Sequence, residues 1–463
     1  MTRGDTIAAI ATAPGRGGVA VVRVSGPDAF AVAKRLTGRE AKSGRVAFAR
    51  LYEGCRGPSR AVEVEGSREL SRAVEADGSR EPSRAIDEAV VLAFAAPRSY
   101  TGEDVVEFQC HGGSVTPRRV LEACFAAGAR LARRGEFTER AFLNGKLDYD
   151  QAAAVLDLVD AKTVRAADAA LEGLSGKSAR DSRELYDAAL SISTELEHAL
   201  DVDEGELPDD FFASLNTQLS TLNSQLLSAI RRAREGKILR TGALVVLAGP
   251  PNAGKSSLMN ALLEENRAIV SDVPGTTRDS IEEWLDLDGW PIRLVDTAGL
   301  RETGDRIEAE GVRRAEELMA KADVVVLLTT AAARTTAADG CRRLSTAIGV
   351  TSKCDLQRGE GLNVSAKTGE GLDELKREIV ARLEAAAERS DGAADGDAQL
   401  PVLLEAQSLL ADFQSPIVDS RVFDLVLAGN AVRTVAEKLG TLVGATYSSD
   451  LLDRLFSRFC VGK

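Results

Sequence analysis

The chain has 463 residues, of which 44% are hydrophobic and 28% are charged, a balance typical of soluble globular proteins. No stretch reaches the roughly 20 uninterrupted apolar residues of a membrane span, and the N-terminus lacks the apolar segment of a secretory signal. The net charge of −13 disfavours broad adhesion to nucleic acid or to anionic membranes, so a cytoplasmic protein without membrane attachment is predicted.

The six cysteines lie far apart without a C-x-x-C pair, and the chain has only two histidines. Neither a disulfide framework nor a zinc site is therefore predicted. Cys460, in the final "FCVGK", stands where a prenylation signal places its cysteine. Gly462 is not aliphatic and Lys463 is outside the residues that usually end such a signal, so prenylation is not predicted.

The first part of the chain, residues 1–145, mixes short β-like runs with turns. The runs "GVAVVRVSG" and "DEAVVLAFAAP" are rich in apolar and β-branched residues, which favours strands. Between them, a twelve-residue unit that begins at Pro58 recurs almost three times with about two apolar positions per copy. Because solenoid repeats are longer and bury a continuous apolar face, residues 58–88 are predicted to be an inserted charged loop.

The period of the apolar residues becomes helical from about Leu147. Val155, Leu158 and Val159 share one helical face. Further on, apolar residues recur at intervals of three or four, at Leu215, Leu219, Leu222, Leu226 and Ile230. A helical domain is predicted over residues 146–240, and it resumes over residues 400–463.

The middle of the chain, residues 241–390, alternates apolar strands with helices. The predicted strands are "ALVVLAG", "IRLVD", "ADVVVLLTT" and "AIGVTSK", and each precedes a turn or a helix. This alternation is typical of a doubly wound α/β sheet. A segment rich in Gly and Asp, "ERSDGAADGDAQ", follows it, so the α/β unit is predicted to interrupt the helical domain.

The stretch "GPPNAGKSS" (249–257) fits the P-loop pattern G-x-x-x-x-G-K-[ST], and it follows a predicted strand and opens a predicted helix. Gly249 and Gly254 let the backbone curl so that its N–H groups face phosphate oxygens. Lys255 places a positive charge on the β- and γ-phosphates, and the Ser256 hydroxyl is a ligand for Mg²⁺.

Four later segments favour GTP over ATP: "SDVPGTTRD" (271–279), "DTAG" (296–299), "TSKCD" (351–355) and "SAK" (365–367). Thr277 offers a second hydroxyl to Mg²⁺, and Asp296 can hold that ion through water. Asp355 would accept hydrogen bonds from guanine that adenine does not offer. The predicted GTP-binding residues are Asn252, Ala253, Gly254, Lys255, Ser256, Ser257, Ser271, Asp272, Val273, Pro274, Gly275, Thr276, Thr277, Asp296, Thr297, Ala298, Gly299, Ser352, Lys353, Asp355, Ser365, Ala366 and Lys367.

Two positions depart from the usual G-protein pattern. Ser352 stands where Asn or Thr usually precedes Lys353, so guanine selectivity is expected to rest on Asp355, with weaker affinity. Leu300 stands where small Ras-like proteins carry the Gln that orients water, so the group that assists hydrolysis must come from elsewhere.

The chain resembles the MnmE (TrmE) family of tRNA modification GTPases over nearly its whole length, excepting the repeat and the segment near residue 390. The blocks that carry the resemblance are "DTIAAIATAPGRGGVAVVRVSG", "SYTGEDVVEFQCHGG", "GEFTERAFLNGKLD", "GPPNAGKSSLMNAL", "DVPGTTRD", "DTAGLRE" and "FCVGK". The P-loop is generic, whereas the N-terminal blocks and the C-terminal C-x-G-K are specific to this family.

The resemblance implies an α/β multidomain protein. Its parts would be an α+β tetrahydrofolate-binding and dimerising domain (1–145), a discontinuous helical domain (146–240 and 400–463) and an inserted Ras-like P-loop GTPase domain (241–390). It also implies a potassium-activated GTPase that acts as a homodimer on tRNA with an FAD-dependent partner of the MnmG (GidA) type. The reaction would add a (carboxymethyl)aminomethyl group at C5 of the wobble uridine, with 5-formyl or 5,10-methylene tetrahydrofolate as one-carbon source.

The resemblance also implies roles for individual residues. Folate contacts fall on Arg23, Glu107, Lys146 and Lys463, Mg²⁺ ligands on Ser256 and Thr277, and K⁺ ligands on Asn252, Ser271, Val273 and Thr276. Glu308 matches the glutamate that orients water, although taken alone it is one acid in a charged helix start. Cys460 is either a nucleophile or redox-sensitive group, or a small packing residue.

An alternative function belongs to another class: a regulatory GTPase switch that binds a macromolecular partner of the ribosome-assembly type without covalent chemistry. The GTPase domain alone does not separate the two readings. A pure switch needs neither a folate pocket nor a terminal C-x-G-K, so residues 1–145 and the tail favour the modification enzyme.

Overall fold

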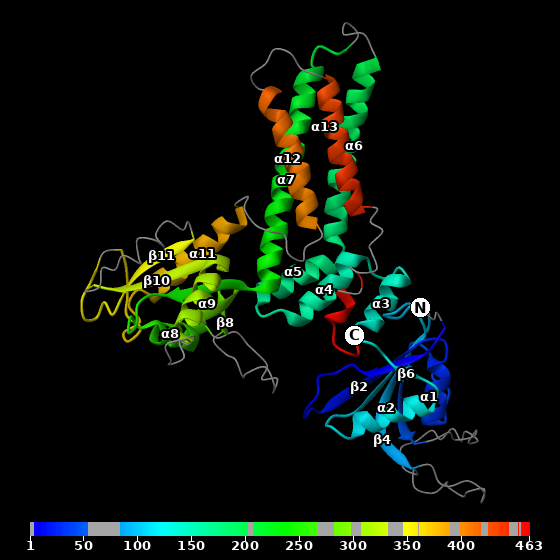
Figure 1. Cartoon of the computed structure of the whole chain (residues 1–463). Coiled ribbons are helices and arrows are strands. Elements are labelled where there is room, and N and C mark those ends of the chain that lie inside the picture. The colour runs from blue at the N-terminus through cyan, green and yellow to red at the C-terminus, as the bar shows by residue number, and fades with distance from the viewer. Residues whose placement is uncertain are drawn as a thin grey trace, which may run out of the picture. The chain divides into compact units, whose positions relative to one another are not determined.

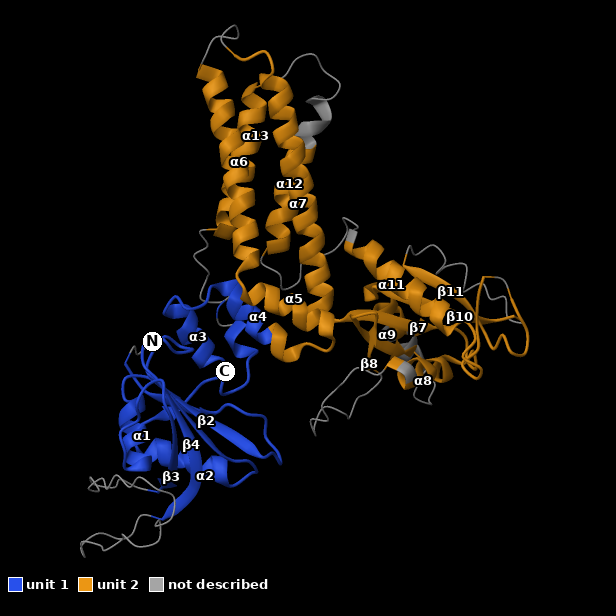
Figure 2. Ribbon diagram, turned by 180° about the vertical axis from the view of Figure 1, so that it is seen from behind, with its two compact units in different colours: residues 1–156, 446–463 blue, residues 157–445 orange. Residues whose placement is uncertain are grey.

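The computed structural model describes residues 4–53, 84–201, 207–266, 282–297, 307–331, 346–359, 361–388, 399–417, 425–443, 452 and 455–463. The chain forms two compact units, residues 1–156 with 446–463 and residues 157–445 (Figure 2). The first unit thus contains both ends of the chain. Among the described residues, no helix is long and apolar enough to cross a membrane.

The first unit is built on a six-stranded sheet with the order β3-β4-β5-β2-β1-β6. Neighbouring strands are antiparallel except for the parallel pair β1–β6. The strands are β1 (Ile7–Ile10), β2 (Val19–Ser25), β3 (Val46–Tyr52), β4 (Ala85–Phe94), β5 (Val105–His111) and β6 (Arg130–Leu131). The two strands expected from "GVAVVRVSG" and "DEAVVLAFAAP" are therefore confirmed as β2 and β4.

Helices α1 (Ala29–Thr37) and α2 (Thr116–Ala126) bury apolar side chains against this sheet. The expected insertion 58–88 differs from the structure at its end, because residues 85–88 are the first residues of β4. There Glu88 lies opposite Arg50 and Asp87 opposite Leu51 of β3, so ladder pairing extends the strand through charged positions. The repeat itself, within residues 54–83, lies outside the described residues.

Two further helices of the first part of the chain are α3 (Glu136–Leu143) and α4 (Tyr149–Asp160). The helix expected around Val155 is confirmed as α4, but its buried residues are Ala152, Ala154 and Leu156. Val159, which was expected on the apolar face, is 48% exposed. Ala152 and Leu156 pack against Leu455, Phe456 and Phe459 near the C-terminus, so the buried face of α4 is the one that carries them and not the one that carries Val159.

The second unit contains a helical bundle formed by α6, α7, α12 and α13 (Figure 1). The helices are α5 (Val164–Leu174), α6 (Lys177–Asp201), α7 (Phe211–Thr241), α12 (Gln399–Ile417) and α13 (Leu425–Val443). The expected stripe on α7, from Leu215 to Ile230, is buried in the core of this bundle. Chain segments on either side of the α/β part therefore share one core.

The α/β part of the second unit is a six-stranded sheet with the order β12-β11-β10-β7-β9-β8. All neighbours are parallel except the hairpin β8–β9. Helices α8 and α11 pack on one face, and α9 packs on the other. The elements are β7 (Ala243–Ala248), α8 (Lys255–Asn266), β8 (Glu282–Leu287), β9 (Trp290–Asp296), α9 (Ile307–Lys321), β10 (Val324–Thr330), β11 (Ala347–Ser352), β12 (Leu362–Val364) and α11 (Leu372–Glu388). The expected doubly wound sheet and its four predicted strands are confirmed.

Candidate functional site

The turn between β7 and α8 has the backbone shape that the P-loop pattern predicts. Gly249, Asn252 and Gly254 all have positive φ, at 146°, 61° and 91°. A Cβ atom at Gly249 would lie 2.3 Å from the carbonyl oxygen of Leu328 on β10. Glycine is therefore required at the start of the turn, both by its conformation and by the close approach of the neighbouring strand.

Lys255, the first residue of α8, folds back over this turn. Its Nζ lies 3.0 Å from the carbonyl oxygen of Gly249 and 3.0 Å from that of Pro250, and the residue is buried. The ammonium group is thus held inside the turn at the N-terminus of a helix. A charge and a helix N-terminus at one place are suited to an anion such as a phosphate.

Two oxygen-bearing residues that are far apart in sequence meet beside the turn. The Ser256 hydroxyl donates to Oδ2 of Asp296 at 2.6 Å. Asp296 ends β9, and the next residue, Thr297, donates its hydroxyl to the carbonyl of Leu247 on β7 at 2.9 Å. Hydroxyl and carboxylate oxygens are ligands that Mg²⁺ prefers, so this pair fits the ion expected here.

The segments expected to read guanine lie against the P-loop. Lys353 has a φ of 58° and donates from Nζ to the Asn252 carbonyl at 2.9 Å. The hydroxyl of Ser365, which is fully buried, donates to Oδ1 of Asp355 at 2.7 Å. This bond orients the carboxylate that the sequence assigns to guanine selectivity.

The remaining expected nucleotide residues divide into two groups. Ser257 lies in the first turn of α8, and Ala366 and Lys367 follow Ser365 in the turn after β12. The residues of the second Mg²⁺ and K⁺ loop and of the glycine turn lie outside the described residues: Ser271, Asp272, Val273, Pro274, Gly275, Thr276, Thr277, Ala298, Gly299 and Leu300. Glu308 belongs to the first turn of α9, and its side chain also lies outside the description.

Two of the four expected folate residues form an ion pair in the first unit. Arg23 on β2 donates from Nε to Oε1 of Glu107 on β5 at 2.8 Å, and the register places the two residues directly opposite each other. The Arg23 guanidinium also lies 5.3 Å from the ring centroid of Tyr100 and 5.6 Å from that of Phe137. The pair is therefore largely shielded from water, which strengthens its electrostatic interaction.

Lys146, the third expected folate residue, contacts the loop that carries Tyr100. Its Nζ donates to the carbonyl oxygen of Pro97 at 3.3 Å. Asn144 donates to the carbonyl of Thr101 in the same loop at 2.8 Å. One loop, residues 95–104, thus connects Lys146 to the aromatic ring beside Arg23.

The C-terminal tail docks on the first unit, as expected. Leu455, Phe456 and Phe459 are buried together with Ala152 and Leu156 of α4. Beyond them, the carbonyl of Cys460 accepts from the backbone N–H of Gly135 at 3.4 Å, and Val461 pairs with Arg134. The tail therefore continues along the segment that leads into Phe137.

Gly462 turns the last residues against β1. Its φ is 106°, and a Cβ atom there would lie 2.2 Å from the carbonyl oxygen of Ile10. Ile10 of β1 lies opposite Val22 of β2, and Val22 precedes Arg23. The turn at Gly462 is therefore made beside the strand pair that carries Arg23, and the terminal Lys463 follows it. The expected turn at Gly462 is confirmed.

Cys460 differs from the other described cysteines because it is exposed, whereas Cys110, Cys124 and Cys354 are buried. Burial raises the pKa of Cys110 to about 11, and it also raises the pKa of Cys124. Since the thiolate is the reactive form, these two thiols are inert at neutral pH. The thiol of Cys460 is at the surface.

The basic run 128–140 makes internal ion pairs. Arg130 contacts Asp5 and Glu136, both at 2.5 Å, and Arg140 contacts Asp5 at 2.7 Å and Glu103 at 3.0 Å. Burial alone would raise the pKa of Glu136. Hydrogen bonds from Arg130, from the Arg133 backbone and from Arg140, with the Arg130 charge, outweigh it and lower the pKa to about 2. Arg130 and Arg140 thus link Asp5, near the start of the chain, to α3 and to the loop 95–104.

Tyr100 and Phe137 are the members of the Arg23 cluster that sequence reasoning did not select. Both stand inside blocks that carry the family resemblance, "SYTGEDVVEFQCHGG" and "GEFTERAFLNGKLD". Desolvation raises the pKa of Tyr100, against the opposing effects of its hydrogen bond with Thr138 and of the Arg23 charge. The tyrosine therefore stays a neutral ring beside the guanidinium.

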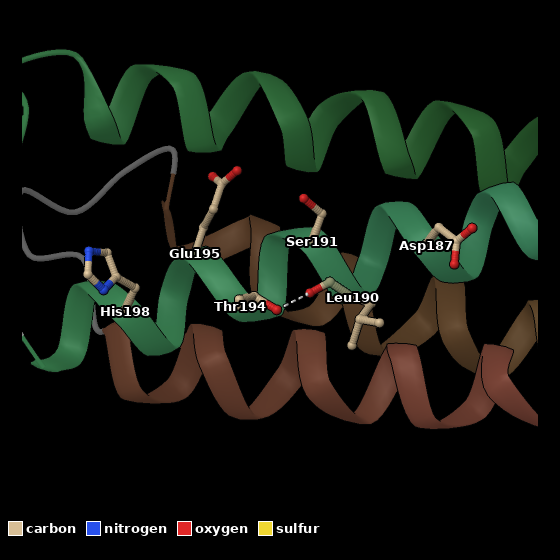
Figure 3. Close-up of a pocket in the computed structure, with 6 residues that line it drawn as sticks. All are labelled: Asp187, Leu190, Ser191, Thr194, Glu195 and His198. Atoms are coloured by element: carbon tan, nitrogen blue, oxygen red, sulfur yellow. Dashed lines mark hydrogen bonds between the residues drawn. The ribbon is translucent and has the colours of Figure 1, made fainter.

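A groove of about 520 Å³ lies elsewhere, on the bundle helix α6 (Figure 3). It is lined by Asp187, Leu190, Ser191, Thr194, Glu195 and His198, and it contains none of the expected site residues. The groove is thus separate from the chemistry that the sequence predicts.

Within the described parts of the chain, no group of three or more His, Cys, Asp or Glu side chains is arranged to hold a metal ion.

Two family models match the chain. Residues 6–146 match that of the GTP-binding protein TrmE N-terminus, and residues 150–460 match that of the MnmE helical domain. Relatives named tRNA modification GTPase MnmE include one from Heliobacterium modesticaldum, 40% identical over 99% of this chain and 100% of its own, and one from Symbiobacterium thermophilum, 41% identical over 99% of both chains. Among solved structures, the G domain of the Thermotoga maritima FeoB iron transporter matches with a TM-score of 0.23 and 29% identity over 30% of this chain and 98% of its own.

Proposed function

The chain belongs to the MnmE family of tRNA modification GTPases, and from this membership we propose that it hydrolyses GTP in order to modify the wobble uridine of tRNA. It would add a (carboxymethyl)aminomethyl group at C5 together with an FAD-dependent partner of the MnmG type. The observation that carries the proposal is the presence, in one chain, of a P-loop cradle and of a separate Arg23–Glu107 cluster beside a docked tail.

Different GTP-binding residues would bind different parts of the nucleotide. Lys255 and the turn 249–254 bind its phosphates, Asp355 reads the base, and Ser256 with Thr277 would hold Mg²⁺, which neutralises phosphate charge when bound. The contact between Ser256 and Asp296 supports this, because it brings a hydroxyl and a carboxylate to the edge of the P-loop. Magnesium chemistry thus has suitable ligands in this chain.

Hydrolysis requires a further group, because Leu300 replaces the usual glutamine. Glu308 would orient the attacking water, and a K⁺ ion held by Asn252, Ser271, Val273 and Thr276 would offset the negative charge that develops in the transition state. The positive φ of Asn252 supports its part, since non-glycine residues rarely adopt this conformation and those that do cluster at functional sites.

The first unit would bind a tetrahydrofolate derivative, either 5-formyl or 5,10-methylene. Arg23, Glu107, Lys146 and Lys463 are its proposed contacts. The aromatic surroundings of Arg23 support the site, because a flat ring and a fixed charge suit a ligand with a heteroaromatic head. The exposed thiol of Cys460 would then act on the one-carbon unit or on the uridine.

The domain organisation follows from the same membership. A folate-binding and dimerising domain would span residues 1–145, a helical domain residues 146–240 and 400–463, and a GTPase domain residues 241–390. Homodimers would pair the nucleotide sites, in a protein that works in the cytoplasm. The alternative function, a regulatory switch without covalent chemistry, has no observation in its favour, because both N-terminal and C-terminal parts match models of the tRNA modification family.

The proposal is tested in bacterial cells that lack their own member of the family, complemented with this chain and its MnmG-type partner. Mass spectrometry of tRNA nucleosides should show the modified uridine with the wild type and not with Lys255→Ala. If the purified chain hydrolyses GTP while no modified uridine appears, the switch reading replaces the enzyme reading.

A further inference from the structure

The hydroxyl of Ser352, the residue that departs from the G-protein pattern, makes hydrogen bonds inside the protein. Ser352 ends β11 and is only 7% exposed. Its Oγ lies 2.6 Å from the carbonyl oxygen of Ala253 in the P-loop and 3.1 Å from that of Thr329 on β10. One side chain thus joins the P-loop to two neighbouring strands of the sheet.

Four backbone carbonyls of the P-loop accept hydrogen bonds from side chains. Lys255 donates to Gly249 and Pro250, Lys353 donates to Asn252, and Ser352 donates to Ala253. Because carbonyl oxygens facing a phosphate would repel it, these donors keep the turn in a conformation that suits an anion. The Ser352 bond fixes the last carbonyl before Gly254, where the turn has a φ of 91°.

A serine hydroxyl carries a single hydrogen, so it can donate fully to only one of these two carbonyls at a time. The shorter distance favours Ala253, and the Thr329 carbonyl receives the weaker share. An asparagine amide carries two N–H donors and could serve both acceptors together. Because the hydroxyl is shared between two acceptors, it holds the Ala253 carbonyl of the P-loop less firmly than a donor used for that carbonyl alone.

We propose that Ser352 is a positioning residue for GTP, which acts by holding the Ala253 carbonyl, and that its single donor limits nucleotide affinity in this chain. The proposal rests on the GTP-binding function proposed above. Ser352 itself would not touch the guanine ring, whose recognition is left to Asp355. Preorganisation of the P-loop before binding lowers the cost of ordering it, so a second donor should slow nucleotide release.

The test measures binding and release of a fluorescent GDP analogue by the full-length chain carrying Ser352→Ala or Ser352→Asn. We expect about fivefold to tenfold weaker binding for the alanine variant and about threefold or more slower release for the asparagine variant. The preference for GDP over ADP should stay unchanged in both, because Asp355 is intact. If Ser352 had a purely structural role, the variants would unfold at a lower temperature, but the alanine variant would not bind more weakly while the asparagine variant released nucleotide more slowly.

Thr329→Val is the matched control. Its hydroxyl also joins the same two strands, donating to the Val350 carbonyl at 3.3 Å. Among the described residues, no hydrogen bond joins this hydroxyl to the P-loop, and the backbone carbonyl that Ser352 uses remains. Nucleotide affinity of this variant should equal that of the wild type. A loss as large as that of Ser352→Ala would overturn the proposal, because it would reflect general loosening of the sheet.

Equal release from the wild type and a folded Ser352→Asn variant would also overturn it. Should the asparagine variant fail to fold, hydrogen exchange of residues 249–258 in Ser352→Ala decides the question: faster exchange is expected, and unchanged exchange contradicts the proposal. If the wild type itself binds no GDP, the proposed GTP-binding function fails, which is a different result.

Discussion

Single charged residues determine how the first unit responds to pH, and Glu136 is the clearest case. Its side chain is 3% exposed and contacts Arg130 and Arg140. Its pKa falls from 4.5 to about 2 on folding, so the carboxylate stabilises the folded state above pH 4.5, and this contribution disappears as the pH falls toward 2. The size of the shift corresponds to about 3 kcal/mol.

Glu136→Gln should therefore lower the free energy of unfolding of the first unit by about 3 kcal/mol at pH 7, and by progressively less below pH 4.5. Hydrogen exchange of peptides from residues 4–53 in the full-length chain, followed in denaturant, measures this. Glu122→Gln is the control, since Glu122 pairs with Arg118 on the surface of α2 at 58% exposure and should change stability within about 0.5 kcal/mol. A difference that stays constant down to pH 3 would contradict the assignment.

Glu308 is the second residue on which a prediction rests. Because orienting water contributes to the transition state and not to binding, Glu308→Ala should lower kcat for GTP hydrolysis by about a hundredfold or more and leave GTP affinity near that of the wild type. Replacing K⁺ by Na⁺ should also cut turnover strongly. A normal kcat in the alanine variant would mean that another residue orients the water.

The sequence predicted best those residues that belong to a short motif, in which the functional residues are close together along the chain. Lys255 and Ser256 follow the P-loop glycines directly, so their placement at the turn followed from the motif. Tyr100 and Phe137 could not be predicted as partners of Arg23, because they come from a loop and a helix that only the folded chain brings to β2. The donor role of Ser352 toward Ala253 was missed for the same reason.

Among the secondary-structure elements, the strands that are buried on both faces were predicted correctly from the sequence. Strands β7 and β10 read as unbroken apolar runs because helices pack on both sides of the parallel sheet. β8, with the sequence "EEWLDL", is an edge strand in which three of the six residues are acidic, which hid it, and β12 has only three residues. α4 was found by its period, but its buried face follows alanines that carry little hydrophobic signal.

The function of the docked tail can be tested by a substitution that displaces it without removing a functional group. Gly462→Ala would place a Cβ atom 2.2 Å from the Ile10 carbonyl at a φ of 106°, so the last two residues must move. Wobble-uridine modification should fall at least about tenfold while GTP hydrolysis stays intact, because catalysis depends strongly on position. Mass spectrometry of tRNA nucleosides measures the modification, a GTPase assay measures hydrolysis, and the alkylation rate of Cys460 reports the displacement of the tail.

Gly44→Ala is the control for this prediction. Gly44 also has a positive φ, of 74°, but a Cβ atom there would meet nothing within 4 Å. It therefore reproduces the backbone strain, which costs about 1 kcal/mol, without the collision. Full modification in the Gly462→Ala variant would show that the tail tolerates displacement.

The whole molecule is assembled from segments that are distant in sequence. Residues 446–463 complete the first unit, and helices α12 and α13 share the bundle core with α6 and α7. Composition and period predicted the helices, but they carry no information on which unit a returning segment joins. That depends on side-chain fit, such as Phe456 and Phe459 against α4.

The insertion between β3 and β4 gives a prediction about the whole molecule, because its two ends meet. Tyr52 lies opposite Ala85, and the Glu53 N–H donates to the Arg84 carbonyl at 2.8 Å. Replacing residues 54–83 by Asn-Gly would therefore close the two strands as a hairpin with a favourable turn. Shortening a connection of thirty residues to two removes about four doublings of loop length, each worth about 0.6 kcal/mol, from the entropy cost of folding.

The shortened chain should unfold at a temperature equal to or above that of the wild type, since the repeat offers few apolar positions to bury. GTP hydrolysis, self-association and tRNA modification should be retained, because the paired strands remain in register. Calorimetry, sedimentation and nucleoside analysis of the full-length and shortened chains measure each of these. A lower unfolding temperature together with a lost dimer would mean that residues 54–83 supply contacts of their own, and the repeat would then be part of an interface.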